Sequence, residues 1–383
     1  MQLNLNSDLK NDFITTPAVK LNAHELGEYI LNELSKEDRE KILKRIAVDK
    51  LLSQVVDDTS NQVIIPFPNT IRENEIRNTK DEVLYYLALS QFKGIGSVML
   101  KRLSLEFHTL KNLFYAPLSL LHEKNVARSV IKNLSDNTLK EVALEVAYQQ
   151  INTCKQEGIN LLFFQNEYFP PELLKDDTIP PLIFYKGDIS FLRHKKLSIF
   201  GKKNPTEFGI RAINSLTSTI ASEGYSIISN ALTASGTQAA FVSAQNNSPP
   251  IVIFPGSLDH SSTKQKRRFI NYILDNAGLV LSVNYPGETY SYRNLLTANK
   301  IQLLLSQAAI IVESDESLAT SQLIMSAKRF EKPVVIPVPP GPYADLNQEI
   351  IKLLKADSTI LQINSRDEYY KIFNMLRELE NVL

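Results

Sequence analysis

The residues best suited to chemistry lie in the segment Leu197–Gly209, which reads LSIFGKKNPTEFG. An apolar run ends at Gly201, Lys202 and Lys203 follow, and residues typical of a helix start come next. Unpaired backbone N–H groups and the positive end of a helix dipole collect at such a turn, and lysines add full charges. The segment predicts a phosphate-binding turn. The alternative is an ordinary solvated turn, because one glycine is less specific than a glycine-rich fingerprint.

The elements that must position this turn are short apolar runs. Six of them, rich in β-branched residues and separated by roughly 15 to 30 residues, are typical of parallel strands covered by helices on both faces. They read LSIFG from 197, YSIISN from 225, IVIFPG from 251, LVLSV from 279, AAIIVES from 308 and VVIPVP from 334. A further short strand is expected over Leu182 to Tyr185, after a proline-rich connector. The pattern predicts a doubly wound, Rossmann-like α/β fold with a mostly parallel sheet.

In such a fold ligands gather beyond the carboxyl ends of the strands, near the point where strand order reverses. The residues expected there are Gly201 to Lys203, Ser229 to Ala231, Pro255 to Ser257, Ser282 to Gly287, Glu313 with Ser314, and Pro339 to Gly341. Small residues, hydroxyls and lysines dominate this set, and Glu313 is its clearest acid. A rim of this composition suits an anionic ligand.

Several chemistries find no support in the sequence. Cys154 is the only cysteine and is expected to be a buried small side chain, so neither a disulfide nor a metal site is predicted. No GxGxxG or GxxxxGK[ST] motif is present, so no nucleotide cofactor is expected. His260 is expected in a surface loop, while Ser229 and Ser257 suit turns, so no catalytic group is assigned.

Charge and hydropathy bound the partners. Lys plus Arg and Asp plus Glu both number 42, so affinity for a polyanion must come from local clusters. No apolar run reaches the roughly 18 residues that a membrane span needs, and the first residues lack a signal-peptide core. We therefore expect a cytoplasmic protein with no membrane partner.

The chain divides into three predicted parts. Residues 1–79 form an appendage of undisclosed role, with an amphipathic helical stretch from Ala23 to Val56. Residues 80–160 are helical, and residues 161–383 form the Rossmann-like domain. In the helical part, Gly94-Ile95-Gly96 separates two apolar helical segments, as in a helix-hairpin-helix unit. This turn either contacts phosphate or is a corner in which the glycines only end a helix. The apolar positions around it are Val83, Leu84, Leu87, Ala88, Val98, Leu100, Leu103 and Leu105.

The order of several segments resembles the DNA-processing protein A family, also called DprA or Smf. They are YFPPELL at 168, PPLIFYKGD at 180, SIFGKKNPTEFG at 198, EGYSIIS at 223, PGSLD at 255, AGLVLSVNYPG at 277, NKIQLLLSQAAIIVE at 299 and NQEIIKLLKADSTILQ at 347. The resemblance covers roughly residues 80 to 365. It implies a non-enzymatic protein that binds single-stranded DNA, protects incoming strands in natural transformation and loads a RecA-type recombinase. A homodimer is a further expected partner.

The resemblance also assigns residues. Lys202, Lys203, Asn299 and Lys300 would hold backbone phosphates, Ser229 and Asn230 would donate hydrogen bonds, and Gly201 would let the strand approach. Where the family has glycine-serine-arginine this chain has Gly201-Lys202-Lys203, and a lysine lacks the bidentate grip of an arginine. The family's arginine-asparagine-arginine, before the fourth helix, corresponds to Ala298-Asn299-Lys300, and its second glycine-rich loop corresponds to Ser229 through Gly236, which has lost an arginine and an aspartate.

Two further groups could contribute to nucleic-acid binding. A secondary basic patch on the helix after the third of the six runs comprises Lys264, Lys266, Arg267 and Arg268, and the alternative is a solvated helix face. Tyr285, Tyr290 and Tyr292 could stack bases or serve as packing residues.

Two other functions stay open at this point. One is a nucleotide-binding sensor, for example in antiphage defence, because the fold also resembles nucleotide-binding Rossmann-like domains. Hydrolysis is disfavoured, since no GTxxE follows Pro255-Gly256-Ser257. The other is a protein-interaction module whose pocket has decayed and whose first residues select the partner.

Overall fold

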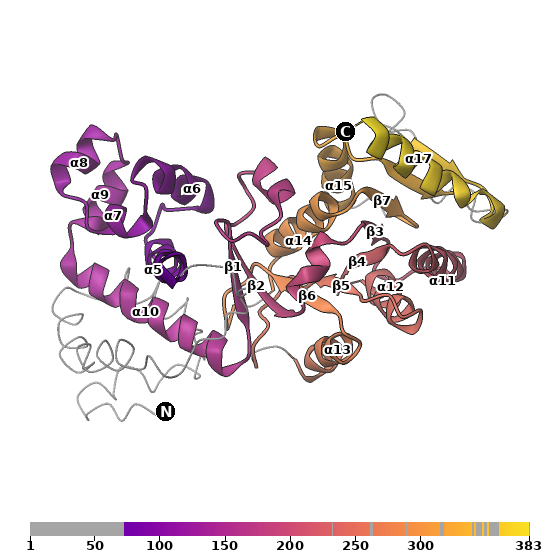
Figure 1. Cartoon of the computed structure of the whole chain (residues 1–383), viewed down its shortest axis with the longest axis horizontal. Coiled ribbons are helices and arrows are strands. Elements are labelled where there is room, and N and C mark those ends of the chain that lie inside the picture. The colour runs from indigo at the N-terminus through magenta and orange to yellow at the C-terminus, as the bar shows by residue number, and fades with distance from the viewer. Residues whose placement is uncertain are drawn as a thin grey trace.

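The computed structural model describes residues 73–231, 233–260, 263–288, 290–314, 318–338 and 360–382, with single residues at 341, 347 and 351. The amphipathic stretch predicted from Ala23 to Val56 lies outside these residues. A nine-stranded sheet lies between layers of helices, and a separate group of helices lies beside one end of the sheet (Figure 1).

The strand order of the sheet is β1-β2-β6-β5-β4-β3-β7-β8-β9. The strands are β1 (Asn160–Phe163), β2 (Leu182–Gly187), β3 (Lys196–Phe200), β4 (Ser226–Asn230), β5 (Ile251–Ile253), β6 (Leu279–Ser282), β7 (Ala308–Ile311), β8 (Val334–Pro337) and β9 (Ile360–Ile363). β2 pairs antiparallel with β1 and β6, and the other neighbours pair parallel. The predicted fold class is confirmed, and β3 to β8 are the six predicted runs.

Helices cover both faces of this sheet. They are α11 (Glu207–Ser222), α12 (Ala234–Gln245), α13 (Lys264–Asp275), α14 (Tyr292–Leu305), α15 (Leu318–Arg329) and α17 (Tyr370–Val382), with short 3-10 turns η1 (Pro171–Lys175), η2 (Ile189–Arg193) and η4 (Arg366–Glu368). Alternation along β3 shows the two faces, because Ile199 packs in the cluster of α11 and α17, and Phe200 packs in the cluster of α15. Each central strand is thus buried on both sides.

The sheet has a switch point beside β3. From β3 the chain adds β4, β5 and β6 in one direction, and it then returns through α14 to place β7 on the opposite side of β3. The loops after β3 and β7 therefore leave toward opposite faces. This opens a crevice at the carboxyl ends of these two strands.

The separate helices are α5 (Glu73–Ser90), α6 (Ser97–Glu106), α7 (Leu110–Phe114), α8 (Leu118–Glu123), α9 (Arg128–Leu134) and α10 (Asn137–Gln156). As predicted, a glycine turn separates α5 from α6. Gly94 has φ of +88°, and Gly96 is the N-cap of α6. Leu100 and Leu103 are buried, whereas Val98 and Leu105 are 52% and 74% exposed. Only part of the predicted apolar set around this turn therefore belongs to the core.

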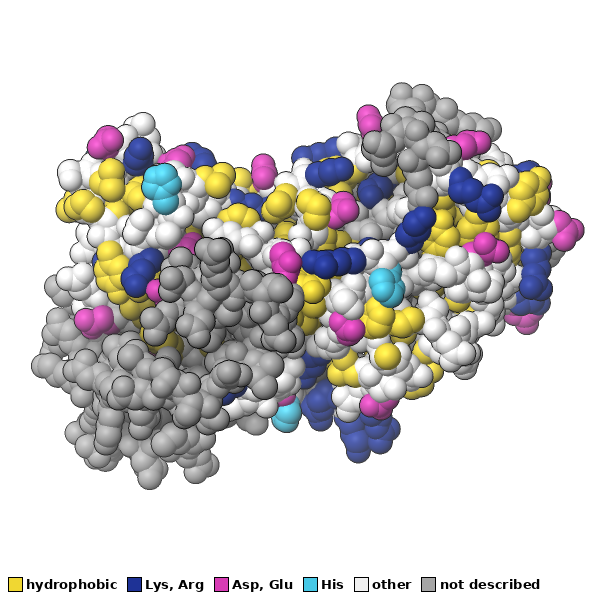
Figure 2. All heavy atoms as spheres, viewed as in Figure 1, with side chains coloured by type: hydrophobic (Ala, Val, Ile, Leu, Met, Phe, Trp, Pro, Cys, Tyr) yellow, Lys and Arg dark blue, Asp and Glu magenta, His cyan; other side chains and the backbone are white. Residues whose placement is uncertain are grey.

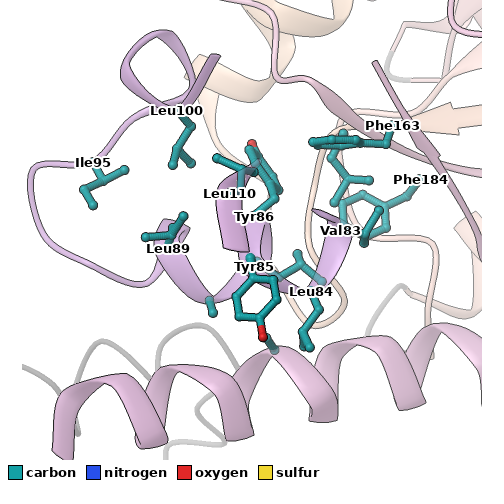
Figure 3. Packing of buried hydrophobic residues seen from close by; sticks show 14 of the residues in the cluster. Val83, Leu84, Tyr85, Tyr86, Leu89, Ile95, Leu100, Leu110, Phe163 and Phe184 are labelled. Carbon is teal, nitrogen blue, oxygen red and sulfur yellow. The ribbon is translucent and has the colours of Figure 1, made fainter. Parts of the chain in front are cut away.

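These helices share one apolar cluster with the sheet (Figure 3). Tyr86 and Val83 on α5 point toward Phe163 and Phe184 of β1 and β2, and the Tyr86 and Phe163 ring centroids lie 5.6 Å apart. The same cluster extends to Val280 on β6. α5 also begins before the predicted boundary at residue 80. The division into three domains stays a prediction, and the packing is continuous across the boundary at 160.

Candidate functional site

A cavity of about 350 Å³ lies at the switch point. It is lined by the carboxyl ends of β3, β4 and β7, by the first half of α14 and by the first turns of α15. Its residues are Phe200, Gly201, Lys202, Lys203, Asn230, Thr233, Tyr290, Tyr292, Leu295, Asn299, Ile311, Glu313, Ser314, Thr320 and Leu323. The structure thus brings together five residues that the sequence assigned to phosphate or DNA binding: Gly201, Lys202, Lys203, Asn230 and Asn299.

The loop after β3 is fixed against the first turn of α12. Ser235 Oγ donates to the Lys202 carbonyl at 2.8 Å, and Ala234 N donates to the Lys203 carbonyl at 3.1 Å. A Cβ at Gly201 would lie 2.6 Å from Ser235 Oγ, so only glycine permits this approach. The backbone of both lysines is held in place, and their side chains border the cavity.

The side-chain amides of Asn230 and Asn299 link the end of β4 to α14, which forms the facing wall of the cavity. Asn230 Nδ2 donates to Asn299 Oδ1 at 3.3 Å. One turn further along α14, the buried Gln302 Nε2 donates to the carbonyls of Ile199 and Ile228, on β3 and β4, at 2.9 and 3.2 Å. These bonds hold α14 across the two strands and so fix the width of the cavity.

Two predicted site residues lie elsewhere. Ser229 is buried in β4 and is not among the residues that line the cavity, because side chains alternate along a strand and Asn230 takes the inward position. Ala298-Asn299-Lys300 lies within α14 rather than before a helix, so its three side chains point in different directions. Ala298 is buried, Asn299 faces the cavity, and Lys300 forms an ion pair with Asp176 at 3.1 Å.

Glu313, the predicted acid of the rim, is turned inward. It is 1% exposed, and its Oε2 accepts from the Thr206 backbone N–H at 2.9 Å. Its Oε1 accepts from the Thr206 hydroxyl. Thr206 is the N-cap of α11, so the carboxylate lies on the positive end of that helix.

The three tyrosines separate into two groups. Tyr285 packs on Phe184, with ring centroids 5.6 Å apart, and belongs to the packing beside the separate helices. Tyr290 and Tyr292 line the cavity and are each 44% exposed.

Two leucines that line the cavity, Leu295 and Leu323, were not predicted from the sequence as site residues. The spacing of Tyr292, Leu295 and Asn299 along α14, at one helical face, was the signal that could have identified Leu295.

The secondary basic patch lies in the first turns of α13. Lys264, Arg267 and Arg268 are exposed, and Lys266 Nζ lies 5.7 Å from the centroid of the Phe254 ring. Arg267 donates to the His260 carbonyl at 2.7 Å. Figure 2 shows Lys and Arg side chains gathered at the lower edge, where Figure 1 places α13. None of the four lines the cavity.

Other titratable groups lie away from the cavity. Burial raises the pKa of the Cys154 thiol to about 12, with the Asp259 carboxylate adding to this effect, so the thiol stays protonated. His260 is exposed and pairs with Glu157 at the end of α10. In the part of the chain that the structure describes, no three His, Cys, Asp or Glu side chains gather as a metal site requires. Among the helices of that part, none combines the length and apolar character needed to cross a bilayer.

A doubly wound sheet with a cavity over its switch point defines a Rossmann-like α/β protein. The family model described as DNA recombination-mediator protein A matches residues 160–370, which is more than half of the chain. The chain belongs to this DprA/Smf family.

Comparison with individual proteins agrees with this assignment. Protein Smf of Synechocystis is 25% identical over 260 residues, which cover 66% of this chain and 64% of Smf. The chain thus matches less than two thirds of that relative's length. The DNA processing protein DprA of Bacillus subtilis is 23% identical over 229 residues, covering 56% of this chain and 76% of DprA. The X-ray structure of Streptococcus pneumoniae DprA has a TM-score of 0.59 and 19% identity over 76% of this chain and 97% of that one, so it shows a shared fold.

Proposed function

We propose that the cavity at the switch point binds the backbone of single-stranded DNA, and that the protein acts by binding rather than by catalysis. One observation carries this proposal. Lys202 and Lys203 border the same cavity as Tyr290 and Tyr292, so cationic groups and aromatic faces lie within reach of one nucleotide. The family description and the names of the relatives, which are DNA processing proteins, support DNA as the ligand.

The electrostatics of the cavity favour phosphate. Thr233 and Tyr292 mark the first turns of α12 and α14, whose positive dipole ends face the cavity together with the two lysines. The nearby acid, Glu313, is engaged by Thr206 and is 1% exposed. The accessible charge at the cavity is therefore positive.

The aromatic side chains favour a single strand over a duplex. A base stacks on a tyrosine only after it has left its neighbours in a helix, and stacking of this kind tolerates any base. Tyr290 and Tyr292 are each 44% exposed, which leaves ring surface available to such a base. The proposed site is therefore expected to bind unpaired strands without sequence preference.

The wider role follows the family. We propose that the bound strand is protected in DNA uptake and handed to a RecA-type recombinase, with a homodimer as the working form. The description of the family as a recombination mediator supports this extension. Assembly of the recombinase on DNA coated with a single-strand-binding protein would test it, because this chain should shorten the lag before filaments form.

Filter binding of oligonucleotides across a salt series tests the central proposal. Wild type should prefer single strands, and the double variant Lys202→Ala/Lys203→Ala should bind more weakly. The slope of log affinity against log salt should fall by about 1.4, since each lost single-strand phosphate contact removes about 0.7. Lys124→Ala/Lys132→Ala is the matched control, because it removes two exposed lysines from the separate helices. Equal salt slopes for wild type and the Lys202/Lys203 variant would contradict the proposal.

A free mononucleotide is the second candidate ligand. The cavity volume of about 350 Å³ falls within the range typical of small-molecule sites. Its apolar wall of Leu295 and Leu323 could receive a base. A thermal-shift panel of nucleotides tests this, since a ligand at 100 times its Kd stabilises the folded state by about 2.7 kcal/mol. A saturable shift with one mononucleotide and none with oligonucleotides would favour the second candidate.

A further inference from the structure

The carboxylate of Glu313 occupies the N-terminus of α11, the helix that follows the first parallel strand of the domain. Oε2 accepts from Thr206 N at 2.9 Å, and Oε1 accepts from Thr206 Oγ1. Thr206 Oγ1 in turn accepts from Gly209 N at 3.2 Å. The carboxylate and the N-cap hydroxyl together accept from the backbone N–H groups of Thr206 and Gly209.

The fit between this carboxylate and the helix is close. A Cβ at Gly209 would lie 2.6 Å from Glu313 Cδ, and 2.7 and 2.8 Å from its two oxygens. Gly209 is itself buried and has an ordinary helical conformation, so its lack of a side chain serves this contact rather than a special backbone angle. The chain thus provides a space of carboxylate size at the start of α11 and fills it with its own side chain.

In doubly wound proteins the helix after the first strand commonly receives the phosphate of a nucleotide, because its N–H groups and dipole attract an anion. A ligand phosphate and the Glu313 carboxylate cannot share this place, since two anions at one helix start repel each other and the carboxylate already occupies the space beside Gly209.

We infer that Glu313 is a specificity-determining residue that excludes ligand phosphate from the α11 N-terminus. A phosphate that enters the cavity is thereby directed to Lys202, Lys203 and the first turns of α12 and α14. Glu313 disfavours a nucleotide bound in the usual manner of this fold, and it leaves the open rim for a continuous backbone. This inference does not depend on DNA binding, because it concerns any phosphate at α11.

Binding of inorganic phosphate and of AMP tests the inference by calorimetry. The parent is Lys202→Ala/Lys203→Ala, in which the lysine contribution is absent, so any phosphate binding that remains belongs to the first turns of α12 and α14 and gives the baseline affinity. Adding Glu313→Ala should raise the affinity for inorganic phosphate by about tenfold or more, as expected for an anion at a partly buried helix start. Potassium chloride at equal ionic strength controls for general salt effects.

A fourth substitution provides the matched control. Gly209→Ala, added to the three others, places a methyl group where the carboxylate was, so the gained phosphate affinity should disappear. If Glu313→Ala unfolds at low salt, circular dichroism should show helix content returning as phosphate rises, and not as chloride rises. No gain with Glu313→Ala by either measurement, or a gain that Gly209→Ala leaves unchanged, would overturn the inference. DNA binding by wild type is measured separately, so its failure would leave this result unaffected.

Discussion

Lys300 Nζ lies 3.1 Å from Asp176 Oδ2, and this ion pair joins α14 to the segment that follows η1. Lys300 also donates to Thr178 Oγ1 at 3.0 Å, while Thr178 N–H and its hydroxyl donate to Asp176 Oδ1 at 2.9 and 2.7 Å. Asp176 is 1% exposed. Lys300, which the family resemblance assigned to DNA binding, therefore anchors α14, the helix that carries Asn299 and Tyr292.

This network predicts a pH dependence of stability. Burial alone would raise the pKa of Asp176, but the hydrogen bonds from Thr178 and Lys300 and the lysine charge outweigh it, so the pKa is lowered. The ionised form is favoured in the folded state, so its contribution is present above the unfolded value of about 3.9 and is lost as the pH falls through the folded value. Urea unfolding from pH 7 to pH 3 should show this loss in wild type. Asp176→Asn should be less stable at pH 7 by about 1.5 to 3 kcal/mol and should depend less on pH below 4. An unchanged profile in the variant would contradict the assignment.

Tyr292→Ala should weaken single-stranded DNA binding by about 1 to 3 kcal/mol, because it removes one exposed ring from the cavity wall. Tyr370→Ala is the matched control, since Tyr370 is another exposed tyrosine, on α17, and does not line the cavity. Fluorescence anisotropy with a labelled oligonucleotide gives both affinities. Equal losses in the two variants would show that the Tyr292 ring does not stack on the strand.

Gly236→Ala should destabilise the fold by about 1 to 3 kcal/mol, because the new Cβ would lie 2.1 Å from the Asn230 carbonyl oxygen and backbone must move. This movement would shift the end of β4, so affinity for DNA should fall as well. Gly96→Ala is the comparison, because nothing lies within 4 Å of a Cβ there and only a capping preference is lost. Urea unfolding should show less than about 1 kcal/mol for Gly96→Ala. Similar costs at both positions would argue against the close contact at Gly236.

The central strands of the sheet could be predicted from the sequence, whereas the strands at its two edges could not. Strands β3 to β8 are buried along their whole length, so they read as uninterrupted apolar runs. β1 and β9 lie at the two edges and are only partly buried, so their short runs, NLLF and ILQI, carry little signal. The antiparallel direction of β2 also has no local signature, because it depends on pairing with the distant β6.

The site was predictable where the chain leaves a strand. Gly201, Lys202, Lys203 and Asn230 follow or end strands, and they line the cavity, whereas Pro255 to Ser257, expected at the same rim, do not. Inside a strand or a helix, the direction of each side chain decides whether it reaches the cavity. Alternation along β4 turns Ser229 away from Asn230, and the helical turn of α14 separates Lys300 from Asn299. A resemblance to a family matches residues by their order along the chain, but it does not show in which direction each side chain points.

The apolar cluster shared by α5 and the sheet links the unfolding of the separate helices to that of the sheet. Phe163 and Phe184 are covered in part by side chains from α5, so removing the helices would expose them to water. Loss of that contact raises the free energy of the remaining sheet. Heat or urea should therefore melt the helices and the neighbouring strands in one cooperative transition, and cleavage before β1 should yield a fragment prone to self-association.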